Sequence, residues 1–416
     1  MEASSQNAQT TDPEAGAAIQ ARLRRMLYLI CGLTDFAAFI VIFAVSRGLA
    51  ERQMPAWYLG AVGAGMSFSA GIGSILGGWL SQRFDGRVIF LIGAAMLPIS
   101  SMTGRGLSPD STWFLPGYWS LGIALGFLYP PLIGWLNQGD DGGRGGRGVS
   151  RTLILFCIAW NVGMMCGQLV AGSLFDRGTF LIFGTAGIIS IVNLLLAIMT
   201  VPLVRVAGQI VTVTEAVPQD PQTEKRATRF KRLSWIANLG GMFGGSLVIH
   251  LLPDLAVTIG IPADRHGVVL ATWRSVIIAT YVVMHRFPFW HYQMQTASAS
   301  QLLAVAGLVL VGSAESAVML LAGLALMGQL VGFNYFSGLF YSTVGSSEKK
   351  RALAAGIHEA TLATGMAIGT MVGGIAGSFI GHRAPYFLAA AVLLLLVFVQ
   401  TTLCRRWTQA DADPSS

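Results

Sequence analysis

Four ionisable side chains occur deep inside apolar stretches of this sequence, where a charge is costly unless it has a task. His358 and Glu359 are adjacent in AGIHEATLATG, while Asp35 and Arg274 lie in two other apolar stretches. A charge at the centre of a membrane costs about 2.5–3.5 kcal/mol on insertion scales. The His–Glu pair begins like the zinc-binding pattern HExxH, but the second histidine is missing. We therefore expect no metal here and look for proton or anion chemistry instead.

The chemistry open to these four side chains is proton transfer and anion binding. Asp35 and Glu359 could each accept a proton as buried carboxylates, and His358 could relay it. Arg274 could hold a carboxylate through two parallel hydrogen bonds. There are structural alternatives: Asp35 and Arg274 could form an ion pair, and Glu359 could bond a polar group on another helix. Neighbours in a helix differ by about 100°, so we expect Glu359 to face inward and His358 to face a neighbouring helix.

Neutral polar and aromatic side chains share the depth of these charges. They are expected to form walls for a small organic ligand, because such sites combine aromatic surface with a few polar groups. The alternative is that Asn161 and Gln168 only hydrogen-bond between helices. The expected ligand-binding residues, with Arg274, are Trp160, Asn161, Gln168, Asn334 and Tyr335.

The composition indicates a protein that crosses a membrane many times. Of the 416 residues, 53% are hydrophobic and 11% are charged, and the mean hydropathy is +0.62. Soluble domains carry about 25% charged residues. The first twenty residues are polar and lack the apolar region of a cleavable signal peptide. The four cysteines have no CxxC or CxxH spacing, so we expect no disulfide, metal or other cofactor.

Twelve apolar runs are long enough to be membrane helices, which need about 20 residues each. With both termini placed in the cytosol, the cytosolic segments hold twenty of the 27 Lys and Arg residues, the outer segments hold six, and Arg274 lies within a span. This bias predicts cytosolic termini and assigns the basic charge to membrane orientation, so no nucleic-acid partner is expected. The predicted spans are roughly 26–46, 57–80, 88–104, 112–136, 152–175, 180–203, 233–252, 267–285, 298–312, 317–343, 352–380 and 385–404.

The twelve spans fall into two similar sets of six. Glycines at 163, 167 and 172 recur 202 residues later, and GFLYPPLIGW in span four resembles GFNYFSGLFY in span ten. Two copies with the same orientation predict two six-helix bundles whose ligand site lies at mid-membrane between them. The predicted organisation is a disordered tail at 1–23, bundles at 24–203 and 232–404, a cytosolic loop at 204–231, and a cytosolic tail at 405–416.

Over about 24–404 the chain resembles the major facilitator superfamily. GGWLSQRFDGR (77–87) is similar to that family's signature Gly-x-Leu-x-Asp-Arg-x-Gly-Arg-Arg, with Gln82 in place of the signature Asp and Asp85 in place of the second Gly. Arg83 and Arg87 match the signature. The resemblance implies a gating role for this cytosolic loop, although a plain basic turn is the alternative. Span five is similar to the family's antiporter motif, with Gln168 at the proline position.

These observations predict a secondary active transporter that moves a small organic solute by alternating access, with a proton as coupling ion. No Walker A, GxSxG or metal cluster is present in the sequence, so we do not expect an enzyme. The alternative is a membrane sensor or assembly partner that transports nothing. We expect a monomer in the lipid bilayer of a bacterial inner membrane. Arg274 favours an anionic solute and Asp35 favours a cation or a proton, so the substrate and the direction of transport stay open.

Overall fold

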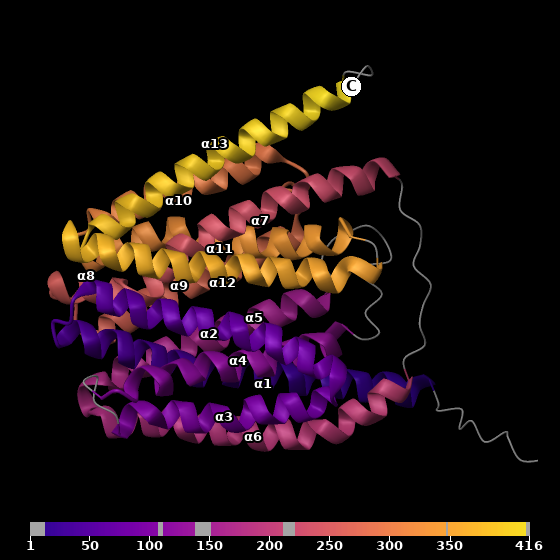
Figure 1. Cartoon of the computed structure of the whole chain (residues 1–416), viewed down its shortest axis with the longest axis horizontal. Coiled ribbons are helices and arrows are strands. Elements are labelled where there is room, and N and C mark those ends of the chain that lie inside the picture. Colours follow the sequence, from indigo (N-terminus) through magenta and orange to yellow (C-terminus); the bar gives the residue numbers. More distant parts are fainter. Residues whose placement is uncertain (1–12, 107–110, 138–150, 211–220, 347, 413–416) are drawn as a thin grey trace, which may run out of the picture.

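Thirteen α-helices and one short 3-10 turn make up the described part of the chain, residues 13–106, 111–137, 151–210, 221–346 and 348–412 of a computed structural model (Figure 1). No strand occurs in these ranges, and the all-α prediction is confirmed. The elements are α1 (Pro13–Glu51), α2 (Ala56–Arg83), α3 (Gly86–Gly106), α4 (Phe114–Asn137), α5 (Arg151–Leu174), η1 (Phe175–Arg177), α6 (Thr179–Ile210), α7 (Pro221–His250), α8 (Leu252–Thr258), α9 (Ala263–Arg286), α10 (Met294–Gly312), α11 (Ala317–Val344), α12 (Glu348–Phe379) and α13 (Ala384–Ala412).

Eleven of the described helices are long and apolar enough to cross a membrane on their own. The helices α7 and α8 meet at a 46° bend and together form one further candidate span, which brings the number to twelve. Pro253 explains the break, because proline has no N–H to donate and its ring clashes with the carbonyl four residues earlier. The prediction of a multi-pass membrane protein is thus confirmed.

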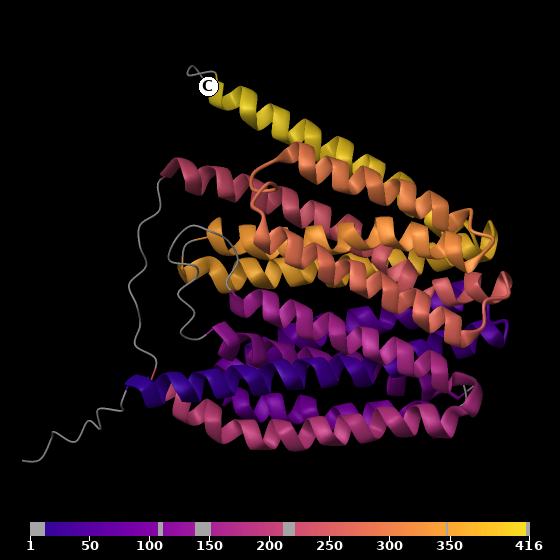
Figure 2. The ribbon, with the colours of Figure 1, turned by 180° about the vertical axis from the view of Figure 1, so that it is seen from behind.

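The helices pack as two groups that follow each other along the chain (Figures 1 and 2). Helices α1–α6 form the first half, and helices α7–α13 form the second half. Two helix pairs dominate the boundary between the halves: α2 packs against α12, and α5 packs against α9. Residues on these four helices therefore lie where a ligand between the halves would bind.

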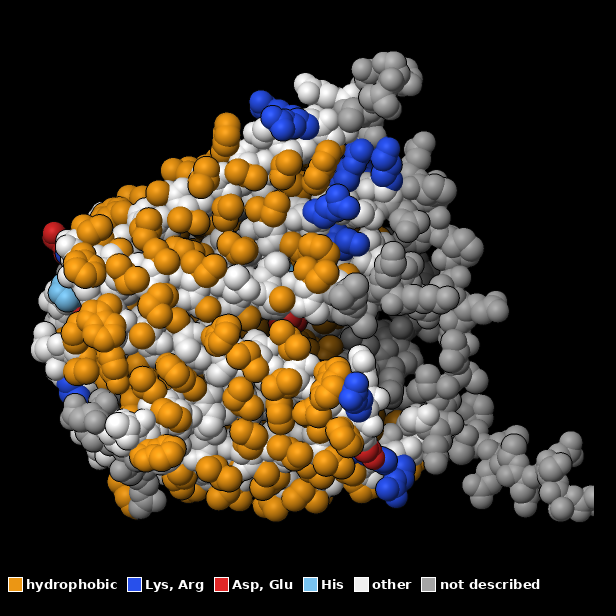
Figure 3. Space-filling view, in the orientation of Figure 1, with side chains coloured by type: hydrophobic (Ala, Val, Ile, Leu, Met, Phe, Trp, Pro, Cys, Tyr) orange, Lys and Arg blue, Asp and Glu red, His pale blue; other side chains and the backbone are white. Residues whose placement is uncertain are grey.

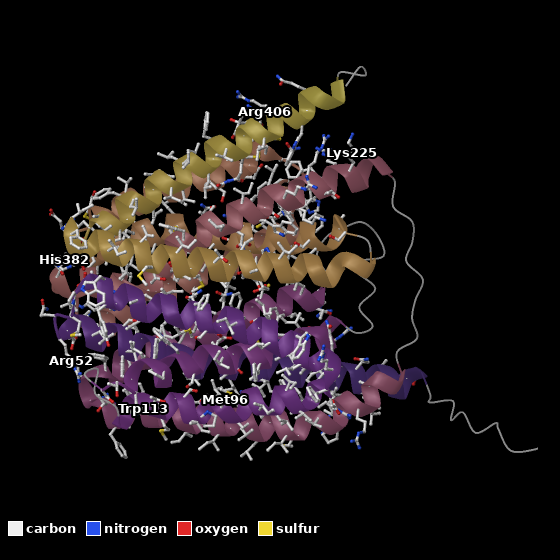
Figure 4. All side chains as sticks on the ribbon, in the orientation of Figure 1. Arg52, Met96, Trp113, Lys225, His382 and Arg406 are labelled. Atoms are coloured by element: carbon white, nitrogen blue, oxygen red, sulfur yellow. The ribbon has the colours of Figure 1, made fainter. Side chains whose placement is uncertain are left out.

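The two ends of the molecule differ in charge. Figure 3 shows Lys and Arg side chains gathered at one end, and a broad hydrophobic band that covers the middle of the surface. Lys225 and Arg406 mark this end, while Arg52 and His382 lie at the opposite one (Figure 4). We call the end with Lys225 and Arg406, where α1 begins and α13 ends, the terminal end. The end with Arg52 and His382 is the distal end. The hydrophobic band suits contact with lipid acyl chains.

At the distal end the two halves are in close contact. A Cβ atom added to Gly172 of α5 would lie 2.8 Å from the Ala263 carbonyl oxygen and 3.0 Å from the Gly267 Cα of α9. Only glycine allows such an approach, as in other packed membrane helices. Hydrogen bonds also join the halves here, from Arg47 Nη2 to the Ile261 carbonyl at 2.9 Å and from the Trp57 amide to Ser378 Oγ at 2.7 Å. The distal end is therefore closed.

Several helices extend beyond the predicted spans. α1 begins at Pro13, inside the segment expected to be a disordered tail, and α6 and α7 reach into the expected inter-bundle loop. The start of α1 has proline and glutamate in its first turn, followed by Ala, Gln and Arg, all of which favour a helix. Helix propensity therefore outweighed polarity at this end. Residues 1–12, the Gly-rich loop at 138–150, residues 211–220 and residues 413–416 lie outside the described ranges.

Candidate functional site

Asp35 is a buried carboxylate with a neutral partner. It lies on α1, is 2% exposed, and accepts a hydrogen bond from the hydroxyl of Tyr129 on α4. The same hydroxyl lies 3.8 Å from Cys31 Sγ. The ion pairs of the described residues do not include one between Asp35 and Arg274, so the structural pair considered as an alternative is not formed. Asp35 is nevertheless close enough to Arg274 for their charges to interact.

Arg274 is a buried cation held mostly by aromatic rings. It lies on α9 and is 4% exposed. Its Cζ lies 4.3 Å from the centre of the Trp273 ring and 5.0 Å from that of Phe39. Its Nη1 donates to Asn161 Oδ1 over 3.4 Å, a long hydrogen bond from α9 to α5. Arg274 and Asn161 thus meet across the boundary between the halves.

Glu359 on α12 is the second carboxylate of the site. Tyr335 of α11 donates a hydrogen bond to its Oε1 at 3.2 Å. Glu359 is half-buried, and its neighbours Gly356 and Ala360 are exposed. The surroundings of Glu359 are therefore more open than those of Asp35.

A row of aromatic rings connects the two carboxylate sites. The ring centres lie 6.3 Å apart for Tyr129 and Phe156, 6.4 Å for Phe156 and Trp160, and 5.1 Å for Trp160 and Tyr335. The last contact crosses from α5 of the first half to α11 of the second. The row begins at the donor to Asp35 and finishes at the donor to Glu359, so adjacent aromatic rings link the partners of the two acids.

The three remaining predicted residues, His358, Asn334 and Gln168, lie beside this row, within one half, and further along α5, respectively. His358 is fully buried and turned towards α11, with its ring 5.2 Å from that of Tyr335 and no hydrogen-bond partner for either nitrogen among the described residues. Asn334 donates to the Ala237 carbonyl of α7 at 2.7 Å, which ties two helices of the second half together. Gln168 is 2% exposed and lies two turns beyond Asn161 on α5. Among the described residues, the hydrogen bond and the ring contacts of the Arg274 side chain involve Asn161, Phe39 and Trp273, but neither Asn334 nor Gln168.

The predicted gating loop makes local contacts. Gln82 and Arg83 are exposed, and the Arg83 guanidinium lies 4.2 Å from the ring centre of Trp79 on its own helix. Asp85 accepts hydrogen bonds from the Arg87 side chain and from the Arg87 backbone N–H, and these hold the pKa of the Asp85 carboxyl below its usual value. Among the described residues, these bonds stay within one loop of the first half.

Sequence reasoning missed Tyr129 and Phe156 as site residues. A signal for Tyr129 was present, because GFLY in span four and GFNY in span ten place Tyr129 and Tyr335 at the same position of the repeat. Phe156 has no comparable signal, since one phenylalanine in an apolar span looks like any other.

Solved structures with the same architecture are transporters. The nucleoside transporter NupG matches with a TM-score of 0.65 and 15% identity, covering 92% of this chain and 98% of its own. The human organic anion transporter MFSD10 (TETRAN) matches with a TM-score of 0.65 and 17% identity, covering 94% and 100%. A structure described for proton dependent oligopeptide transporters matches with a TM-score of 0.66 and 11% identity, covering 92% and 98%.

The sequence itself identifies the family. No curated protein matches the chain. The family model of the Major Facilitator Superfamily, in contrast, matches residues 26–347, which is most of the chain. Together with the two packed halves and the similar transporter structures, this match shows that the chain is a membrane transporter of the Major Facilitator Superfamily.

Proposed function

We propose that the protein is a secondary active transporter that couples the movement of a small organic solute to a proton. The observation that carries the proposal is that both carboxylates, Asp35 and Glu359, accept a hydrogen bond from a tyrosine hydroxyl and form no ion pair among the described residues. A hydroxyl can donate to a carboxylate and can also accept from a carboxylic acid. Such a partner tolerates both protonation states, as a proton-carrying group requires.

Glu359 is the preferred proton carrier. A carrier must exchange its proton with water as well as hold it inside the protein, and Glu359 is half-buried beside exposed Gly356 and Ala360. Asp35 is sealed at 2% exposure. The fully buried His358 packs behind Tyr335 and is a candidate for adjusting or relaying the charge of Glu359.

Alternating access requires the halves to separate at one end and close at the other. The contacts of Gly172 with α9, and the hydrogen bond from Arg47 to Ile261, are the distal contacts that would have to open. We further propose that residues 24–203 and 232–404 move as the two rigid bundles. The basic side chains gathered at the terminal end favour its placement in the cytosol (Figure 3).

The test is the substitution Glu359→Gln, which mimics a permanently protonated acid. A thermal-shift screen of organic acids, amines, nucleosides and sugars first identifies a stabilising solute. In proteoliposomes, the wild type should accumulate that labelled solute when a pH difference is imposed. The Glu359→Gln variant should still exchange the solute across the membrane but should no longer accumulate it.

The matched control is Glu315→Gln, since Glu315 is an exposed glutamate between α10 and α11. This control should accumulate solute like the wild type. Undiminished pH-driven accumulation by Glu359→Gln would remove Glu359 from the mechanism and leave Asp35 as the acidic candidate. A stabilising solute that the wild type binds but never moves would favour the alternative, a membrane sensor.

A further inference from the structure

The guanidinium of Arg274 has an unused edge. Its Nη1 donates the long hydrogen bond to Asn161, whereas Nε and Nη2 have no hydrogen-bond partner among the described residues. Nε–H and one N–H of Nη2 point in the same direction, and this edge of an arginine binds a carboxylate through two parallel hydrogen bonds. Arg274 therefore presents a complete carboxylate-binding edge inside the protein.

A purely structural role does not account for this edge. Contact with an aromatic ring stabilises an arginine, and Arg274 has two such contacts, with Trp273 and Phe39. Rings offer no hydrogen-bond oxygen to Nε and Nη2, which have no partner among the described residues. A buried donor on a charged group is destabilising when it is left without a partner. A ligand that supplies two oxygens would remove that cost.

The surroundings of Arg274 favour an aromatic ligand with one negative charge. Tyr281 lies two turns further along the same face of α9, and its ring is 6.4 Å from that of Tyr335. With Trp273, Phe39 and Trp160, these rings place aromatic side chains of both halves around Arg274. Arg274 is the one cation in this described group of residues, so a second carboxylate on the ligand would find no partner there.

We propose that the Nε and Nη2 edge of Arg274 binds the carboxylate of an aromatic monocarboxylate, which is the class of solute transported. This inference rests on the proposed transport function. It specifies an anionic solute, whereas the sequence alone was compatible with an anion or a cation. With 4% of Arg274 exposed, the two halves must move apart before the solute can enter or leave.

The experiment compares acids with their uncharged amides on the purified full chain. The probes are benzoate, phenylacetate and 3-phenylpropionate, each with its amide, and binding is followed by isothermal titration calorimetry and by tryptophan fluorescence. We expect at least one acid to bind about tenfold or more tightly than its amide, since two hydrogen bonds to a charged group are lost. Equal binding of every acid and its amide, or binding of none of the acids, would overturn the proposal.

The variant Arg274→Lys tests the residue itself. Lysine keeps the positive charge but lacks the two parallel N–H donors of arginine, so the affinity for the acid should fall about tenfold or more. The matched control is Arg265→Lys, an exposed arginine on the same helix, which should bind like the wild type. Unchanged acid binding in Arg274→Lys would overturn the proposal. If Arg274→Lys does not fold, judged by size-exclusion chromatography and thermal unfolding, the comparison of acids with amides on the wild type decides.

The results also separate this inference from the proposed function. A clear preference for acids without any pH-driven accumulation would support the Arg274 site and reject proton-coupled transport. Accumulation of a neutral or cationic solute that is unaffected by Arg274→Lys would support transport and reject the carboxylate site.

Discussion

Tyr129 and Tyr335 occupy the same position of a repeated GFxY sequence, and each donates a hydrogen bond to a carboxylate. Tyr129 bonds Asp35 of α1 in the first half, and Tyr335 bonds Glu359 of α12 in the second. The acids themselves are not at equivalent positions of the repeat. The repeat therefore supplied two similar donors, and each half placed its acid on a different helix beside one of them.

Removing the hydroxyl of Tyr335 should impair transport. In Tyr335→Phe, the carboxylate of Glu359 loses a donor that stabilises its charged form, while the aromatic contact with Trp160 remains. We expect initial rates of pH-driven uptake in proteoliposomes to fall about tenfold, since hydrogen bonds to charged groups contribute about 1.5–3 kcal/mol. The control is Tyr118→Phe, because the buried Tyr118 hydroxyl has no partner among the described residues. Equal rates in both variants would show that the Tyr335 hydroxyl has no part in coupling.

If an aromatic monocarboxylate binds Arg274, its affinity should depend on pH through Asp35. Charged Asp35 and Arg274 balance each other, so a bound carboxylate adds an uncompensated negative charge unless Asp35 takes up a proton. Benzoate binding measured by calorimetry should therefore weaken as the pH rises, by up to about tenfold per pH unit.

The variant Asp35→Asn should bind benzoate with little dependence on pH. The other titratable groups bonded into the same cluster as Asp35 are Tyr129 and Cys31, and ordinary phenols and thiols titrate above neutral pH. A wild-type pH dependence that persists in Asp35→Asn would assign the proton to another group, with Glu359 as the next to test.

A methyl group at Gly172 should open the distal end. The added carbon would lie 2.8 Å from the Ala263 carbonyl oxygen, and backbone cannot give way as a flexible side chain can. We expect Gly172→Ala to destabilise the closed distal contact by about 1–3 kcal/mol, the usual cost of overpacking. Distances between spin labels at exposed Arg177 and Arg265, in a cysteine-free background, should then shift to longer values. Gly184→Ala, where a Cβ meets nothing within 4 Å, should leave the distribution unchanged.

The ion pair of Asp85 and Arg87 should contribute little to stability or transport. The Asp85 side chain is 41% exposed, and exposed pairs contribute about 0–1 kcal/mol. Because folding lowers the pKa of Asp85, its small contribution is present above the ordinary pKa of an aspartate and is lost as the pH falls through the lowered value. Thermal unfolding of Asp85→Asn should differ slightly from the wild type at neutral pH and not in strong acid. A large loss of uptake in this variant would indicate that the pair bridges the halves in another conformation.

Much of the architecture was predictable from one sequence, because a membrane simplifies the folding problem. Apolar runs must become helices there, and a repeat of six spans in one orientation leads to two bundles. The two neighbours His358 and Glu359 differ in burial, since the first is fully buried and the second is half-buried, although both contact Tyr335 of α11.

The partners of the polar side chains were not predictable in the same way. Depth along a helix can be counted from its end, but the rotation of that helix against its neighbours depends on side-chain packing from distant segments. Asn334 shows the difference, since its amide reaches the Ala237 carbonyl of α7 within its own half. The unpaired Nε and Nη2 donors of Arg274 could not be predicted either, because they depend on how Asn161, Phe39 and Trp273 pack around the guanidinium.

The glycine contact at the distal end also has a thermal consequence. Around Gly172 and Gly267 the halves meet through backbone and small apolar groups, so opening this end to water exposes apolar surface while breaking few hydrogen bonds there. Exposure of apolar surface raises the heat capacity, and apolar contact weakens on cooling. The free-energy difference between the closed and open forms therefore varies non-linearly with temperature. A turnover rate that is limited by this opening step gives a curved Arrhenius plot.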